Sequence, residues 1–294
     1  MAHYSIKDLE KISGIKAHTI RIWERRYNLI EPSRTATNIR YYDDDDLKRI
    51  LNVSILNQNG YKISKIAQMD ENQLRERVID LCLDTRNTDV QIESLLVAML
   101  EMDESKFTNV LTNSIIKLGF EATVESILFP FLTRIGILWQ AGTINPAQEH
   151  FISNLIRQKL IVAIDNEMQN FIPKSDKNLV FFLQENELHE IGLLFYSLIA
   201  RKEGYNVVYL GASVPIEDLK VVSGVRNVDA MVTSFVTANK KEELESYLKQ
   251  LTNELPEVPF FITGLQIKEH SPIMPKTCKV VTTSQEFKSF ISEL

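Results

Sequence analysis

The feature that most restricts the fold of this chain is a change in hydrophobic pattern near residue 175. After the polar linker 173–177, short apolar runs alternate with amphipathic segments. This alternation predicts a parallel sheet with helices on both faces, where ligands bind at the carboxyl ends of the strands. The expected strands are 179–183, 207–210, 230–234, 259–263 and 279–282, and the expected helices are 189–203, 215–226, 240–254 and 286–293.

The segment before the linker has a different pattern, with little Pro or Gly and apolar residues at helical spacing. It predicts an antiparallel bundle of four helices near 89–102, 105–119, 121–141 and 146–169. Pro130 should kink the third helix. Asn145 followed by Pro146 is a favourable start for the fourth.

The first seventy residues predict a third kind of module. Ser5 and Asp8 have the spacing of a capping box, and Ser13-Gly14 ends that first helix after about two turns. A second helix follows at once, with Ile20 and Trp23 spaced to pack inward. Two short helices joined by a Gly-containing turn make a helix-turn-helix, whose second helix reads the DNA major groove.

A short polar segment, 29–42, follows the second helix and predicts a small hairpin or wing. Arg34 and Arg40 lie on it, where they suit phosphates or a narrow minor groove. The acidic run 43–46 favours the start of another helix, and a last short helix is expected after Gly60.

Charge is distributed unevenly along the 294 residues. Residues 1–69 hold 12 Lys/Arg and 8 Asp/Glu, although the whole chain has a net charge of −6. A basic end on an acidic body indicates contact with a polyanion, although chance asymmetry gives the same count.

We see no apolar run of about 18 residues and no signal peptide, so we expect a cytoplasmic protein without membrane contact. Cys82 and Cys278 are too few for a disulfide framework or a thiolate metal site.

The N-terminal motifs resemble a known family. Thr19-Ile20-Arg21, the run 23–27 (Trp-Glu-Arg-Arg-Tyr), Pro32-x-Arg34 and the run 40–42 (Arg-Tyr-Tyr) resemble the winged helix-turn-helix of the MerR family, in the branch of light-responsive carotenogenesis regulators. The resemblance covers about residues 3–70. Asn38-Ile39 replaces the family's usual Gly-Tyr, so we expect the wing to turn differently. The DNA-binding residues implied are Lys16, His18, Thr19, Arg21, Arg25, Arg26, Tyr27, Arg34, Arg40 and Tyr41.

In the helical segment, Trp139 is followed after nine residues by Glu149-His150. Taken alone, such a Trp is usually a core residue and such a pair is usually on the surface. The arrangement resembles the cap bundle of photosensory cobalamin proteins, and this implies that these three residues hold the adenosyl group of adenosylcobalamin. Some of these relatives carry a His after the Trp, whereas this chain has Gln140, a poor cobalt ligand.

Glu187-x-His189-x-x-Gly192 lies where the first strand of the sheet ends and its helix begins. A His in this loop can direct a ring nitrogen towards a ligand while Glu187 accepts the other ring N–H. Gly192 would allow close approach of a ligand. A lone His at this place is more often a helix cap than a ligand.

Later motifs extend this pattern. Together with the segment 209–212, Pro215, Ser234-x-Val236 and Thr263-Gly264, it resembles the cobalamin-binding fold over residues 178–294. The resemblance implies that His189 is the lower cobalt ligand and that Glu187 orients it. Three residues of this chain depart from the family's usual pattern: Glu187 replaces Asp, Val236 replaces Leu and Thr263 replaces Gly. The cofactor-binding residues implied are Trp139, Glu149, His150, Glu187, His189, Gly192, Gly211, Ser234, Val236, Thr263 and Gly264.

We therefore expect a multidomain α and α/β protein. Its parts are a winged helix-turn-helix (1–75), a four-helix cap bundle (76–172) and a flavodoxin-like, Rossmann-type cobalamin-binding domain (178–294). The expected function is that of a non-enzymatic regulator, a repressor by resemblance, which binds operator DNA as a homodimer or tetramer and senses light or cofactor state through adenosylcobalamin. The alternatives are a regulator of this fold that has lost the cofactor, and a corrinoid carrier for methyl transfer.

Overall fold

The computed structural model describes residues 4–35, 38–82, 88–140, 144–169, 171–237 and 240–294. The chain divides into two units, Met1–Ser153 and Asn154–Leu294, with the boundary inside a long helix. Each unit is described by itself.

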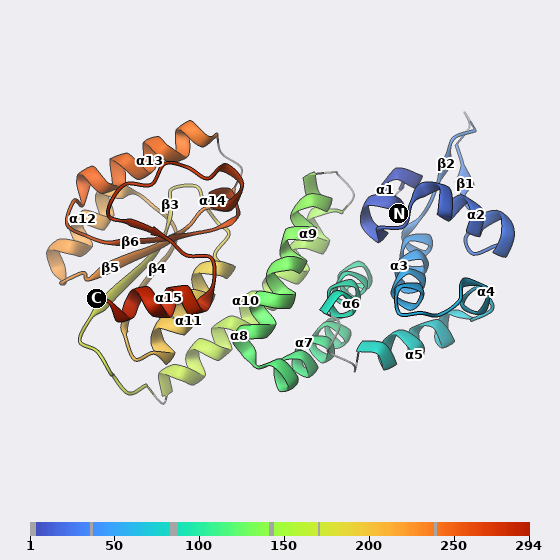
Figure 1. Ribbon diagram of the computed structural model, residues 1–294, viewed down its shortest axis with the longest axis horizontal. Coiled ribbons are helices and arrows are strands. Elements are labelled where there is room, and N and C mark those ends of the chain that lie inside the picture. The colour runs from blue at the N-terminus through green and yellow to red at the C-terminus, as the bar shows by residue number, and fades with distance from the viewer. Residues whose placement is uncertain (1–3, 36–37, 83–87, 141–143, 170, 238–239) are drawn as a thin grey trace. The chain divides into compact units, whose positions relative to one another are not determined.

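The first unit begins with the predicted helix-turn-helix and wing (Figure 1). The capping box at Ser5 and the end of the first helix at Gly14 are confirmed. A helix over Glu71–Cys82, which the sequence analysis did not predict, follows the DNA-binding module. The elements are α1 (Ile6–Ser13), α2 (Ala17–Tyr27), β1 (Ser33–Arg34), β2 (Arg40–Tyr41), α3 (Asp44–Gln58), α4 (Ile63–Ile66) and α5 (Glu71–Cys82).

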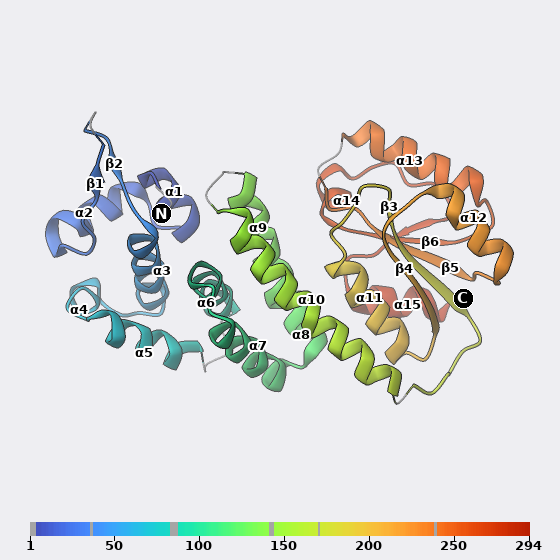
Figure 2. The ribbon, with the colours of Figure 1, turned by 180° about the vertical axis from the view of Figure 1, so that it is seen from behind.

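The predicted four helices of the middle segment are present, and α3 packs on the first of them, α6 (Figure 2). The third is interrupted. A π-helical turn over Val124–Leu128 precedes Pro130, because proline has no N–H to donate to the preceding turn. Asn145 caps the fourth helix, since its Oδ1 accepts from the Gln148 N–H at 3.1 Å. The elements are α6 (Thr88–Glu101), α7 (Glu104–Leu118), α8 (Phe120–Thr123), η1 (Val124–Leu128), α9 (Phe129–Gln140) and α10 (Pro146–Gln169).

The composite helix Phe120–Trp139 is long and apolar enough to cross a membrane by length and composition. The sequence analysis did not register it, because polar residues interrupt the apolar run. Phe131, Ile135 and Leu138 are buried on one side of it, and Arg134 lies between them. One side of this helix is therefore packed inside the first unit, while Ile137 and Trp139 are exposed.

The second unit contains the predicted parallel sheet, in the order β4-β3-β5-β6-β7. This is the flavodoxin-like order, in which the first strand lies beside both the second and the third and the ligand site is expected there. A short helix over Leu265–His270 was not predicted. The elements are β3 (Asn178–Gln184), α11 (Ile191–Lys202), β4 (Asn206–Val214), α12 (Ile216–Val225), β5 (Ala230–Ser234), α13 (Lys241–Glu254), β6 (Phe260–Thr263), α14 (Leu265–His270), β7 (Cys278–Val280) and α15 (Ser284–Ser292).

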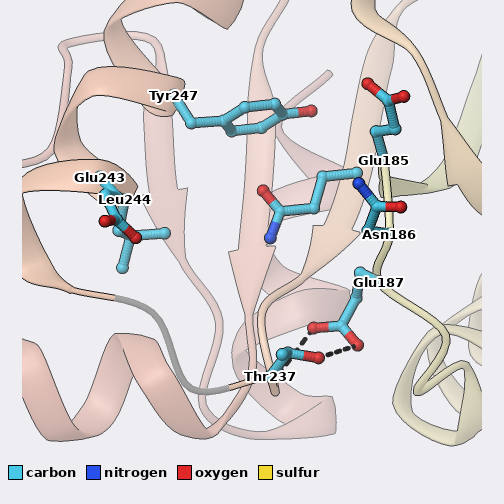
Figure 3. Close-up of a pocket in the computed structure, with 8 residues that line it drawn as sticks. Glu185, Asn186, Glu187, Thr237, Glu243, Leu244 and Tyr247 are labelled. Atoms are coloured by element: carbon cyan, nitrogen blue, oxygen red, sulfur yellow. Dashed lines mark hydrogen bonds between the residues drawn. The ribbon is translucent and has the colours of Figure 1, made fainter.

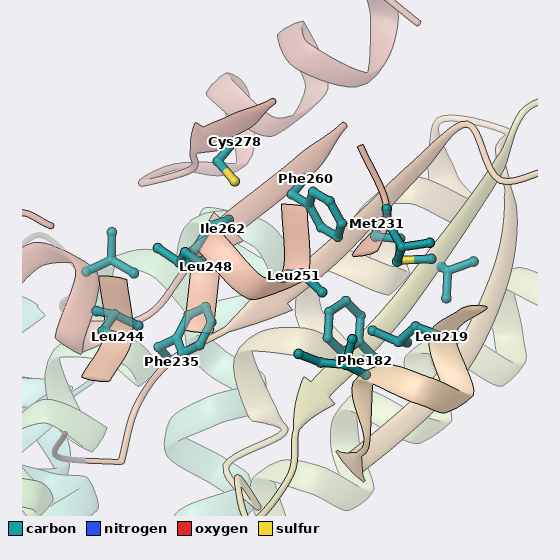
Figure 4. Close-up of a cluster of buried hydrophobic side chains, with 14 residues drawn as sticks. Phe182, Leu219, Met231, Phe235, Leu244, Leu248, Leu251, Phe260, Ile262 and Cys278 are labelled. Carbon is teal, nitrogen blue, oxygen red and sulfur yellow. The ribbon is translucent and has the colours of Figure 1, made fainter. Parts of the chain in front are cut away.

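Successive residues of the strands serve opposite faces of the sheet. Phe182 and Phe260 pack with Leu219 of α12 and Leu248 of α13 (Figure 4). On the other face, the Phe181 ring lies edge-on to Phe287 of α15 at a centroid distance of 6.3 Å. Both faces are therefore covered, and the strand ends and their loops are left to form a site.

Candidate functional site: a DNA-binding surface and a histidine loop

The predicted DNA-binding surface consists of α2 and the wing. Ile20 and Trp23 of α2 are buried, as predicted, and hold the helix on its own module. The basic side chains consequently point outward. Among the predicted DNA contacts, Lys16, His18, Arg21, Arg25, Arg26, Arg34 and Arg40 are exposed, and Thr19, Tyr27 and Tyr41 are half-buried.

The wing is a two-stranded antiparallel ribbon in which Ser33 pairs with Tyr41. Asn38 has a φ of 65°, in the left-handed region that Asn tolerates better than most residues. Its side-chain oxygen accepts from Arg34 Nη1 at 2.7 Å. Asn38 thus occupies the left-handed region itself, and its side chain is held by Arg34.

Two residues that the sequence analysis left without a role attach the wing to the module. The Tyr42 hydroxyl donates to Glu24 of α2, which ties the base of the wing to the second helix. Arg49 of α3 donates from Nε to the Leu29 carbonyl at 2.8 Å and also pairs with Glu71. Both contacts join residues about 20 positions apart, so local pattern did not reveal them.

Trp139, at the end of α9, is 46% exposed, which is unusual for a core tryptophan. Glu149 and His150 lie in the first turns of α10, and Glu149 Oε2 is 2.8 Å from His150 Nδ1. All three residues belong to the first unit. The connection at 141–143 and the Gln140 side chain lie outside the described part of the chain.

Glu187 and His189 form a close polar contact in the second unit. The Glu187 side chain has an exposed fraction of 0%, whereas that of His189 has 58%. Glu187 Oε1 is 2.7 Å from His189 Nδ1 and also accepts the N–H groups of Leu188 and His189. The carboxylate thus engages one ring nitrogen, and coordination of a metal would fall to Nε2.

The other end of the same carboxylate is held by the segment after β5. Glu187 Oε2 accepts from the N–H groups of Val236 and Thr237, and the Thr237 hydroxyl donates to Oε1 at 2.8 Å (Figure 3). Burial alone would raise the pKa of Glu187, but the hydrogen bonds from His189, Thr237 and Val236 outweigh it and lower the pKa to about 2. Thr237 was not among the predicted site residues.

The remaining predicted cofactor residues surround the ends of β3, β4, β5 and β6. A Cβ on Gly192 would meet Ser234 Oγ at 3.7 Å, so the start of α11 lies against the buried end of β5. Gly264 has a φ of 113°, and a Cβ there would lie 2.2 Å from the Phe235 carbonyl oxygen, so only glycine fits. Thr263, just before it, is buried, Val236 is half-buried, and Gly211 at the β3–β4 irregularity has a φ of 81°.

A hollow of about 300 Å³ opens beside this loop, between the end of β3 and α13 (Figure 3). Its lining includes the side chains of Glu185, Glu187, Glu243 and Tyr247. Within the described residues, no group of three or more His, Cys, Asp or Glu side chains could hold a metal ion alone.

A second cluster braces the histidine loop and was also missed. Glu190, next to His189, pairs with Arg157 of α10 and accepts from the Tyr209 hydroxyl of β4 at 2.9 Å. All three residues lie in the second unit. The cluster fixes the start of α11 from two elements that are distant in sequence.

Comparison with known proteins defines the class to which these features belong. Residues 4–73 match the MerR HTH family of regulatory proteins, and residues 91–163 match the B12 binding domain. The second unit has the sheet of corrinoid-binding proteins: a Methanosarcina barkeri monomethylamine corrinoid protein superposes with a TM-score of 0.51 at 14% identity, covering 74% of this chain and 99% of that one. At this identity the similarity shows the fold alone.

Two relatives extend over most of the chain. The HTH-type transcriptional repressor CarH of Myxococcus xanthus is 27% identical over 290 residues, which is 96% of both proteins. The repressor CarA of the same organism is 29% identical over 268 residues, 90% of this chain and 88% of the relative. The chain is homologous to these repressors. It is a cobalamin-sensing transcriptional regulator with a MerR-type DNA-binding domain, and both relatives are named as repressors rather than as enzymes.

Proposed function

We propose that this regulator is a repressor that binds adenosylcobalamin, with His189 as the lower cobalt ligand, and that the state of the cofactor sets its affinity for operator DNA. The observation that carries the proposal is the Glu187–His189 pair, in which one buried carboxylate accepts from the ring and from two segments of backbone. Such a partner fixes ring orientation and makes the imidazole a better metal donor.

The rest of the lower site fits the nucleotide tail of a cobalamin. Gly192 and Ser234 leave little side-chain volume between the start of α11 and the end of β5. Beside them, Gly264 has no side chain, so the Phe235 backbone can lie directly against it. We assign Gly211, Val236 and Thr263 to the same channel. Thr263 contributes a side chain where relatives have glycine, and its burial favours a narrow channel.

The upper site consists of Trp139, Glu149 and His150. Adenosylcobalamin, when bound, supplies a cobalt–carbon bond that light can break. The half-exposed Trp139 ring offers a flat apolar surface for an adenosyl group, and the Glu149–His150 pair offers polar partners. Position 140 carries an amide, a poor cobalt ligand, so His150 is the cap residue that would respond to loss of the adenosyl group.

DNA binding rests on α2 in the major groove and on the wing at the backbone or minor groove. One such module covers a half-site only, so a homodimer or tetramer on a two-fold operator is expected. A protein with this target is expected in the cytoplasm, where it meets DNA. Light is the proposed signal, because light can break the cobalt–carbon bond of the cofactor and because Trp139, Glu149 and His150 resemble the cap of photosensory cobalamin proteins.

Two substitutions test the DNA-binding assignment. Arg21→Ala should weaken operator binding by about 1–3 kcal/mol if Arg21 reads a base edge, while Arg40→Ala should also flatten the salt dependence by removing a phosphate contact. The probe is the duplex that the protein enriches from a randomised pool, measured by fluorescence anisotropy at fixed salt. Arg226→Ala, an exposed arginine of the second unit, is the matched control. Unchanged affinity in both test variants would contradict the assignment.

A further inference from the structure

A polar cluster lies inside the first unit, where the helix-turn-helix meets the helical bundle. Arg134 comes from α9, Glu93 from α6 and Gln58 from α3. The side chains of Arg134 and Glu93 are only 25% and 6% exposed. The cluster joins the segment that matches the MerR family to the segment that matches the B12 binding domain.

The contacts converge on the end of α1. Arg134 Nη2 donates to the Ile12 carbonyl, and Arg134 Nη1 lies 3.9 Å from Glu93 Oε1. Gln58 hydrogen-bonds Glu93 and donates to Ser54 Oγ at 3.0 Å. Ser54 in turn donates to the Ser13 carbonyl at 3.1 Å. Two successive carbonyls at the end of α1 are therefore held by side chains of α9 and α3.

These carbonyls are the acceptors that a helix leaves unsatisfied at its C-terminus, where partial negative charge favours a cation. Arg134 thus satisfies an orphan carbonyl and supplies the positive charge. Gly14 follows with a φ of 74°, and α2 begins at Ala17. Because so few residues separate Ile12 from α2, the position of the Ile12 carbonyl constrains the start of the recognition helix.

Arg134 also has a fixed relation to the upper cofactor site. It precedes Trp139 by five residues on the same helix, an axial distance of about 7–8 Å at 1.5 Å per residue. A helix moves as one body over that length. A shift of the Trp139 end of α9 therefore displaces the guanidinium that holds Ile12.

We propose that Arg134 is a positioning residue through which α9 sets the placement of α2, so that a cofactor bound at Trp139 changes operator affinity through the Arg134–Ile12 contact. The inference rests on the proposed function. It deepens that function by naming the contact that connects the two sites, since neither Arg134 nor Ile12 belongs to the DNA-binding surface or the cofactor site.

The test uses the full chain and Arg134→Gln. Operator affinity is measured with and without adenosylcobalamin in the dark, and cofactor affinity is measured by absorbance titration. Allosteric ratios of about 5–150-fold are typical between coupled sites. In Arg134→Gln the ratio of the two operator affinities should fall towards one, while cofactor affinity stays within about two-fold of the unaltered chain.

Three further variants separate positioning from general stability. Ser54→Ala removes the donor to Ser13 from within the DNA-binding module, so it should weaken operator binding equally with and without cofactor and keep the ratio. Thr133→Ala, next to Arg134 on α9 with an exposed side chain, should behave as the unaltered chain. Arg134→Lys keeps a cationic donor and should recover part of the ratio.

A full ratio in Arg134→Gln would overturn the inference. If that variant does not fold, hydrogen exchange of residues 13–17 in the unaltered chain decides: cofactor should change their protection, and unchanged protection contradicts the inference. Failure of the proposed function looks different, because the unaltered chain would then show no spectral change with adenosylcobalamin.

Discussion

Glu187 and Glu93 are both buried, yet their carboxyl groups are held in opposite ways. At the histidine loop, hydrogen bonds from His189, Thr237 and Val236 lower the pKa of Glu187 to about 2. At the end of α1, burial raises the pKa of Glu93 to about 7, against the attraction of Arg134 and a hydrogen bond from Gln58. The nearest Arg134 nitrogen is 3.9 Å away, too far for a good hydrogen bond.

The difference lies in the number and direction of donors. Around Glu187, backbone N–H groups from two loops point at fixed oxygens and favour the charged form. Around Glu93, desolvation prevails because fewer donors reach it, and Asp89 adds repulsion. One region holds the proposed metal ligand His189 with many hydrogen bonds, while the other is a junction with few hydrogen bonds to its buried carboxyl group.

The largest effect is expected for His189→Ala. His189 is the one protein ligand proposed below the cobalt, so adenosylcobalamin affinity should fall by about 100-fold or more. This loss exceeds the one typical of removing a residue that only hydrogen-bonds a metal ligand. Absorbance titration in the dark measures it. His270→Ala, a histidine of the second unit on α14, is the control and should leave the titration unchanged. Unchanged affinity in His189→Ala would refute the ligand assignment.

A smaller effect is expected for Glu187→Gln, because the ring keeps its place in the chain but loses its charged partner. In either orientation of the glutamine amide, its NH₂ group would face a backbone N–H of His189 or Thr237, so two donors would oppose each other. Adenosylcobalamin affinity should fall about 10–100-fold. The matched change Glu257→Gln, at an exposed glutamate of the second unit outside the hollow, should leave affinity unaltered. Equal titrations for both variants would mean that the carboxylate does not orient His189.

The smallest effect concerns Glu93 and pH. Its native pKa is raised above the unfolded value, so the native state binds more protons between pH 4.5 and about 7, and stability falls as pH rises through that range. The groups facing Glu93 are Arg134 from α9, Gln58 from α3 and Asp89 from its own helix. In Glu93→Gln the stability relative to the unaltered chain should rise by about 1–2 kcal/mol between pH 5 and pH 8. Urea unfolding at both pH values measures this, and a pH-independent difference would show that Glu93 does not titrate there.

The sequence predicted most of the architecture because each module has its own hydrophobic period. The sheet, its strand positions and the helix-turn-helix follow from that period and from caps such as Ser5 and Asn145. Three elements were not predicted from the sequence. Seven of the twelve residues of α5 are polar, and α14 has only six residues. The π turn before Pro130 arises from the missing N–H, which indicates a distortion but not its form.

The site was predictable only where a motif is local. Glu187, His189 and Gly192 lie within six positions of one another, so spacing revealed them. Thr237 reaches Glu187 from 50 residues away, Arg157 reaches Glu190 from 33, and Arg134 reaches Ile12 from 122. Such contacts depend on how strands and helices come together, and a threonine or arginine alone gives no sign of them.

His189 is proposed to make the DNA-binding surface responsive to adenosylcobalamin. The most direct test is the affinity of the unaltered chain and of His189→Ala for the selected operator duplex, each with and without adenosylcobalamin, in the dark and after green light. We predict that cofactor and light change the affinity of the unaltered chain and leave that of His189→Ala unchanged. An equal response in both proteins, at a cofactor concentration that saturates only the unaltered chain, would contradict the account.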